Sequence, residues 1–170
     1  MTDNLDELVE ELVKDAGRKS AMTLNLAVGH SLTATLYGMF NFWAGMLNTV
    51  LAATTSVSAL SKIDGSGTLT AILSVLVAAL TAMLTFLSPS DRNKFHSDAA
   101  TEFEILSGKL DRFRDVVVKN EKDYKNLEMS LDELIERYFK IRKTYPVPAW
   151  ALDFAIKWLK KSGNKEKFFH

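Results

Sequence analysis

Two stretches of this chain depart from the alternation of apolar and charged residues found elsewhere in it. From Ser20 to Ser61 there is no Asp, Glu, Lys or Arg, and the same holds from Gly65 to Ser90. Outside these stretches, apolar residues recur at every third or fourth position with charged residues between them, which is the pattern of amphipathic helices. The sequence therefore predicts an all-α protein in which two uncharged helices lie between charged ones.

Each uncharged stretch is long enough to cross a membrane. A hydrocarbon core is about 30 Å thick, so one helical span needs about 20 predominantly apolar residues. We place the two spans at about residues 40–60 and 69–87. The segment between them, "KIDGSG", has the glycine, aspartate and serine of a turn. Residues 20–90 are therefore predicted to form a two-span transmembrane hairpin.

The basic residues around the hairpin predict its orientation. Arg18 and Lys19 precede it, Arg92 and Lys94 follow it, and the turn contains only Lys62. Because basic residues near membrane helices are retained on the cytoplasmic side, we expect both termini in the cytoplasm.

Three charged segments are predicted to form helices outside the membrane. Residues 1–19 form an N-terminal amphipathic helix, with a bend expected at Gly17. Residues 91–145 form a cytosolic helical region with a charged break around Lys119–Asp123. Residues 149–161 form a C-terminal amphipathic helix whose tryptophans and lysines fit either a lipid headgroup layer or packing on the cytosolic helices.

Small and polar residues recur on one face of each predicted span. They are Asn41, Gly45, Asn48, Ala52 and Thr55 in the first span, and Thr70, Ser74, Thr81 and Thr85 in the second. Two interpretations of these faces are open, namely close helix packing with interhelical hydrogen bonds, or uncharged rings that line a pore. Asparagine is costly in hydrocarbon without a partner, and two helices alone cannot easily shield both faces. We therefore expect a homo-oligomer in a lipid membrane.

Composition and motifs restrict the chemistry further. Lys+Arg and Asp+Glu both total 21 and there is no cysteine, so no thiolate metal site is possible and no nucleic-acid partner is expected. Zinc-binding histidine pairs, phosphate-binding glycine loops and nucleophile elbows are missing. We expect neither an enzyme nor a cofactor or metal. His30 is expected to be packed and neutral, and His96 to make a surface or interhelical hydrogen bond, with a pH-sensitive contact as the alternative.

The segment after the second span resembles part of a known family. It reads "DRNKFHSDAATEFEILSGKLDRF" and has His96, the small pair Ala99 and Ala100, Phe103 and Leu106 at helical spacing. This segment, preceded by an N-terminal helix and a two-span hairpin, is similar to the SLATT family of bacterial two-span membrane proteins. The resemblance covers about residues 18–142.

The resemblance implies an effector of bacterial conflict and antiviral systems. Such effectors are activated by a nucleotide-sensing or second-messenger-producing partner, assemble in the inner membrane and breach it, which kills or arrests the infected cell. His96, Phe103 and Leu106 are the contact candidates of the cytosolic helices. One alternative is a non-conducting membrane scaffold that recruits a cytosolic partner through its C-terminal helices. Another is a soluble helical bundle that inserts only when triggered.

Overall fold

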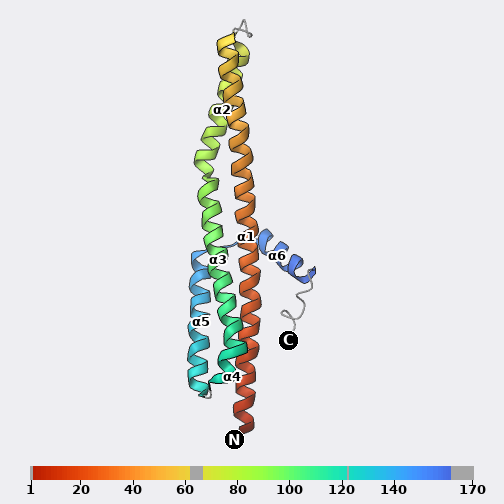
Figure 1. Ribbon diagram of the computed structural model, residues 1–170, viewed down its shortest axis with the longest axis vertical. Coiled ribbons are helices and arrows are strands. Elements are labelled where there is room, and N and C mark those ends of the chain that lie inside the picture. Colours follow the sequence, from red (N-terminus) through yellow and green to blue (C-terminus); the bar gives the residue numbers. More distant parts are fainter. Residues whose placement is uncertain (1, 62–66, 122, 162–170) are drawn as a thin grey trace. The chain divides into compact units, whose positions relative to one another are not determined.

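A computed structural model describes residues 2–61, 67–121 and 123–161, which are helical almost throughout (Figure 1). The elements are α1 (Thr2–Ser61), α2 (Thr68–Leu87), α3 (Pro89–Arg112), the π-helix η1 (Phe113–Val117), α4 (Val118–Asn120), α5 (Tyr124–Thr144) and α6 (Ala149–Lys161). No strand occurs within these ranges. The predicted all-α fold is confirmed for them, whereas most of the predicted turn, residues 62–66, lies outside the described residues.

The chain divides into two compact units. Unit 1 comprises Met1–Thr33 together with Phe95–His170, and unit 2 comprises Ala34–Lys94. Helices α1 and α3 contribute to both units, because each continues across a boundary between them. Unit 1 is therefore discontinuous in sequence, and its two parts are separated by the whole of unit 2.

Unit 1 is a bundle in which the first part of α1 packs with α3 and α5 (Figure 1). Its buried core consists of Ala16, Leu26, Ala27, Phe103, Leu106, Leu110, Phe113, Leu127, Leu131, Tyr138 and Ile141. Val9 and Leu12 pack against this core, as does Leu152 of α6. The apolar stripe of the N-terminal segment is thus used for packing within the chain.

Local sequence explains where the helices of unit 1 begin and continue. The side chain of Asp123 accepts a hydrogen bond of 3.0 Å from the backbone N–H of Lys125 and so caps α5. The bend expected at Gly17 does not occur, because α1 continues through it. A glycine inside a helix costs only about 1 kcal/mol relative to alanine, and the continuous helix buries Ala16 and Ser20 on either side.

Unit 2 pairs the second part of α1 with α2. The half-buried positions of α2 are Thr70, Leu73, Val77, Leu80 and Leu84. After α2 the chain turns at Ser88, whose φ of 40° is left-handed. The Ser88 hydroxyl donates to the Thr85 carbonyl at 3.0 Å.

Helix α1 and the start of α3 approach each other closely where unit 2 begins and ends in sequence. Asn93 Nδ2 donates to the carbonyl of Ala34 at 2.7 Å. A Cβ atom at Gly38 would lie 2.6 Å from the same nitrogen. Glycine is therefore the residue that leaves room for this hydrogen bond.

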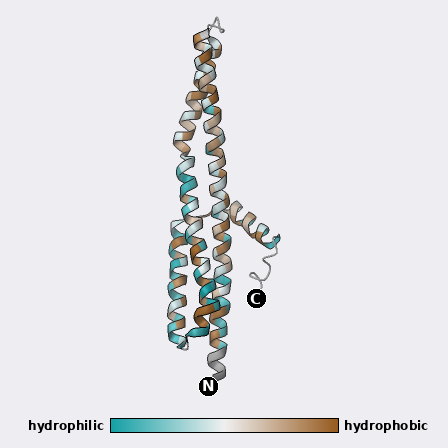
Figure 2. Cartoon of the chain, in the orientation of Figure 1, coloured by the Kyte–Doolittle hydropathy of each residue, from teal (hydrophilic) through white to brown (hydrophobic). Residues whose placement is uncertain are grey.

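Among the described residues, one helical segment is long and apolar enough to cross a membrane. It lies within Thr68–Asn120, its most apolar 18-residue window has a mean hydropathy of 2.3, and no residue of that window is buried in the chain. Figure 2 shows predominantly apolar colouring along α2. The segment 40–60 of α1 falls short of the same standard, since two asparagines and several threonines and serines lower its mean hydropathy. A membrane crossing by residues 40–60 of α1 therefore stays a prediction.

Candidate functional site

The polar face of α1 in unit 2 is mostly half-buried, and Asn48 on this face contacts α2. Gly45, Asn48, Ala52 and Thr55 are half-buried, whereas Asn41 is exposed. Asn48 Nδ2 donates to Thr81 Oγ1 at 3.1 Å. Near the end of α1, the hydroxyls of Ser58 and Thr70 are 3.1 Å apart. These polar contacts join the paired helices.

The polar residues of α2 are placed differently. Thr70 is half-buried, but Ser74, Thr81 and Thr85 are exposed. The hydroxyls of Ser74 and Thr85 donate to the carbonyls of Thr70 and Thr81, four residues earlier, at 2.8 and 2.9 Å. Because these bonds satisfy the hydroxyl protons within the helix, the exposed polar face can lie against lipid or against another protein chain.

One acceptor between the two helices is not satisfied. Asn48 Oδ1 is buried and has no hydrogen-bond partner, although the amide nitrogen of the same side chain is bonded to Thr81. A buried amide oxygen without a donor costs free energy, and such atoms in folded proteins call for an explanation. A donor from water or from another copy of the chain would remove this cost.

Unit 1 contains a buried pair of histidines that join α1 to α3. His30 is fully buried and His96 is 8% exposed, and their Nδ1 atoms are 2.8 Å apart. The ring of His30 stacks on Phe103 with a centroid distance of 5.5 Å, and the ring of Phe95 meets His96 edge-on at 5.3 Å. Each histidine of the pair therefore contacts an aromatic ring of α3.

The environment of the pair keeps His30 neutral. Burial lowers the pKa of His30 from 6.5 to about 4, the His96 ring lowers it in the same direction, and the backbone of Tyr145 acts in the opposite direction. In the hydrogen bond, one Nδ1 donates and the other accepts. Protonation of both rings would turn both atoms into donors and would place two like charges side by side, so the contact requires at least one neutral ring.

We expect unit 1 to lose stability as the pH falls from 7.5 to 5. Unfolded His30 gains its proton near pH 6.5 and folded His30 only near pH 4, so acid favours the unfolded state. Stability is complete above pH 6.5 and falls by about 1.4 kcal/mol per pH unit below it, which gives about 2 kcal/mol by pH 5. Chemical denaturation in detergent at both pH values measures the loss. An equal loss in His30→Gln would contradict the assignment to this residue.

The structure brings the three cytosolic contact candidates together in the core of unit 1. Phe103 and Leu106 are completely buried, and His96 is nearly so. The neutral, packed state expected for His30 agrees with its burial and its pKa. Sequence analysis did not find that His30 and His96 pair, because the two residues are 66 positions apart and no local pattern links them.

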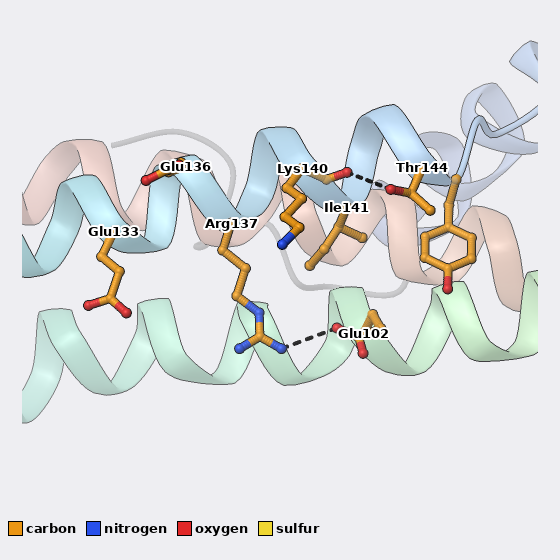
Figure 3. A pocket seen from close by; sticks show the side chains of 8 residues that line it. Glu102, Glu133, Glu136, Arg137, Lys140, Ile141 and Thr144 are labelled. Atoms are coloured by element: carbon orange, nitrogen blue, oxygen red, sulfur yellow. Dashed lines mark hydrogen bonds and ion pairs between the residues drawn. The ribbon is translucent and has the colours of Figure 1, made fainter.

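A shallow groove of about 480 Å³ lies between α3 and α5 (Figure 3). It is lined by Glu102, Glu133, Glu136, Arg137, Lys140, Ile141, Thr144 and Tyr145. Arg137 points across it to Glu102, with Nη2 3.2 Å from Oε2. Three carboxylates against two basic groups give no preference for a phosphate-bearing ligand. No cluster of three metal-ligating side chains occurs in the described part of the chain.

These features define the class of the protein coarsely, as an all-helical chain with a helix apolar enough to cross a membrane. No protein-family model, curated protein or solved structure matches the chain. A particular function must therefore be argued from the residues themselves.

Proposed function

We propose that this protein is an oligomeric effector of the bacterial inner membrane that forms a pore or disrupts the bilayer. In this proposal the second part of α1 and the whole of α2 both cross the membrane, and unit 1 lies in the cytoplasm. The observation that carries the proposal is the large, uncharged and apolar surface that unit 2 leaves exposed.

Helix α2 contributes the most apolar part of this surface. None of its residues is buried, and the exposed fractions of Val75 and Phe86 are 68% and 88%. Monomeric soluble proteins rarely expose contiguous apolar surface on this scale. Since Gly65–Ser90 carries no charge, hydrocarbon is the medium that suits this surface.

The second part of α1 adds a similar surface. Phe42, Trp43, Val57 and Leu60 are exposed by 57% or more, and no charged residue interrupts them. The polar groups of this helix raise the free energy of membrane insertion. The contacts of Asn48 with Thr81 and of Ser58 with Thr70 lower that cost. A polar group in a membrane is tolerated when another helix satisfies it.

An oligomer accounts for the polar groups that a single hairpin leaves over. Asn48 Oδ1 lacks a donor, and the exposed Ser74 and Thr85 of α2 make hydrogen bonds within their own helix and not to α1. In an assembly of several hairpins, these groups line contacts between copies or a central path that contains water. The path is uncharged and so discriminates weakly between ions.

The resemblance to the SLATT family supports an antiviral or conflict role. In that role, a nucleotide-sensing or second-messenger-producing partner triggers the effector, and membrane breach kills or arrests the cell. Unit 1 is the part of the chain that would receive the trigger.

Induced expression with a membrane-potential dye, combined with carbonate extraction of the membranes, tests the proposal. Retention of the protein in the washed membrane with collapse of the potential is the expected result. Retention without collapse, even together with the triggering partner, would favour a non-conducting scaffold. Recovery of the protein in the soluble fraction would contradict both the pore-forming effector and the membrane scaffold.

Replacing Asn48 with leucine is expected to abolish the collapse of the potential without preventing insertion. The substitution removes the amide that bonds Thr81 and its unsatisfied oxygen, while the helix becomes more apolar. Thr54→Leu is the matched control, because Thr54 is exposed and its hydroxyl bonds only the Val50 carbonyl of its own helix. Equal dye responses from the Asn48→Leu variant and the unaltered chain would remove Asn48 from the mechanism.

A further inference from the structure

Helix α6 presents two chemically different faces. Ala151, Ala155 and Leu159 are buried, with at most 3% exposed. Trp150, Phe154 and Trp158 are 51–52% exposed. Each set repeats every four residues, and neighbouring residues on a helix lie about 100° apart. The aromatic residues therefore form one continuous stripe beside the buried face, which we call the α6 stripe.

The start of α6 packs closely against α1. A Cβ atom at Gly29 would lie 3.2 Å from Val147 Cγ2 and 3.5 Å from the Ala151 carbonyl oxygen. This spacing shows how closely the start of α6 approaches α1. A tryptophan could not replace the small Ala151 at such a contact without moving the helix.

Lysines accompany the stripe. Lys157 follows Trp150 by seven residues and Lys161 follows Phe154 by seven, which returns both lysines to the face that carries the aromatic rings. Both lysines are exposed. Asp153 is the one acidic residue of α6, against three lysines, so the helix has a net positive charge.

This chemistry matches an anionic lipid surface better than a second copy of the helix. Tryptophan is enriched where hydrocarbon meets the headgroups, and lysines beside it are attracted to anionic lipids. Two copies of α6 would instead bring together two helices that each carry a net positive charge. We propose that Trp150, Phe154 and Trp158 enter the headgroup layer of an anionic bilayer while Lys157 and Lys161 contact lipid phosphates.

Tryptophan fluorescence can test this proposal in the full-length protein. The chain has three tryptophans, so a Trp43→Phe variant emits only from Trp150 and Trp158. The variant is added to vesicles of phosphatidylcholine and phosphatidylglycerol that contain lipids brominated near the headgroup. A clear loss of emission is expected, and the loss should be smaller in vesicles without phosphatidylglycerol.

Charge reversal tests the role of the lysines. In the same background, Lys157→Glu with Lys161→Glu should reduce the quenching. Lys125→Glu with Lys143→Glu changes the net charge equally at exposed positions of α5 and should leave the quenching unchanged. Equal effects of the two double variants would contradict the lysine contacts.

The inference shares with the proposed function the premise that the chain meets a bilayer, and a second variant separates the two. Trp150→Phe with Trp158→Phe leaves Trp43, which reports on the first proposed span. Quenched Trp43 with unquenched α6 tryptophans would overturn the α6 proposal and leave the span standing. Quenched α6 tryptophans with unquenched Trp43 would support the α6 proposal and contradict the first proposed span. Unquenched but blue-shifted α6 emission would show that protein covers the stripe, which also overturns the proposal.

Discussion

Replacing Phe103 with alanine is expected to lower the free energy of unfolding of unit 1 by about 3–5 kcal/mol, the usual cost of removing a fully buried phenylalanine. The side chain is 0% exposed and stacks on His30, so its loss leaves a cavity and uncovers the histidine pair. Because a whole domain is stable by only about 5–15 kcal/mol, this loss threatens the bundle. Chemical denaturation followed by circular dichroism measures it.

Ile105→Ala is the matched control for this experiment. Ile105 lies on the same helix two positions away and is 47% exposed, so its replacement by alanine leaves little cavity. A change below about 1 kcal/mol is expected there, as is usual for exposed positions. Comparable losses from the two variants would mean that Phe103 does not lie in a closely packed core.

Leu76→Arg is expected to release much of the protein from the membrane, because only the more polar proposed span in α1 then remains. Leu76 lies near the middle of α2 and is 47% exposed. A charge at the centre of a membrane helix disfavours insertion by about 2.5–3.5 kcal/mol, which is roughly a 100-fold change in the inserted fraction. The measurement is the share of protein that resists carbonate extraction.

Thr68→Arg provides the comparison for the Leu76 variant. Thr68 is the first residue of α2, where a long basic side chain reaches the headgroups and costs little. This variant should stay in the membrane fraction. If both variants remain there in equal amounts, α2 does not cross the bilayer.

The sequence predicts helix type and helix ends where strong local signals occur. The uncharged stretch after the predicted turn predicted a helix at about 69–87, and α2 spans Thr68–Leu87. The amphipathic tail predicted a helix at 149–161, the range that α6 occupies. In both cases the flanking prolines, turn residues and charges act over a few positions, so a single sequence contains the information.

Contacts between distant segments could not be predicted in the same way. The sequence did not predict which side of α2 meets α1: Leu73, Val77, Leu80 and Leu84 are half-buried, whereas Ser74 and Thr85 are exposed. In a helix that is apolar on every side, periodicity does not tell which side meets the neighbour. The aromatic rings around His30 likewise come from another helix, and no spacing rule reports them.

The discontinuity of unit 1 has a consequence for the order of events during synthesis. Its first part ends at Thr33 and its second begins at Phe95, so Phe103 and Leu106 leave the ribosome after all of unit 2. At about 5–20 residues per second, the residues between Thr33 and Phe95 take roughly 3–12 s to translate. Helix α2 therefore emerges from the ribosome before the bundle of unit 1 can close. It is thus exposed to lipid or to chaperones before the core of unit 1 exists.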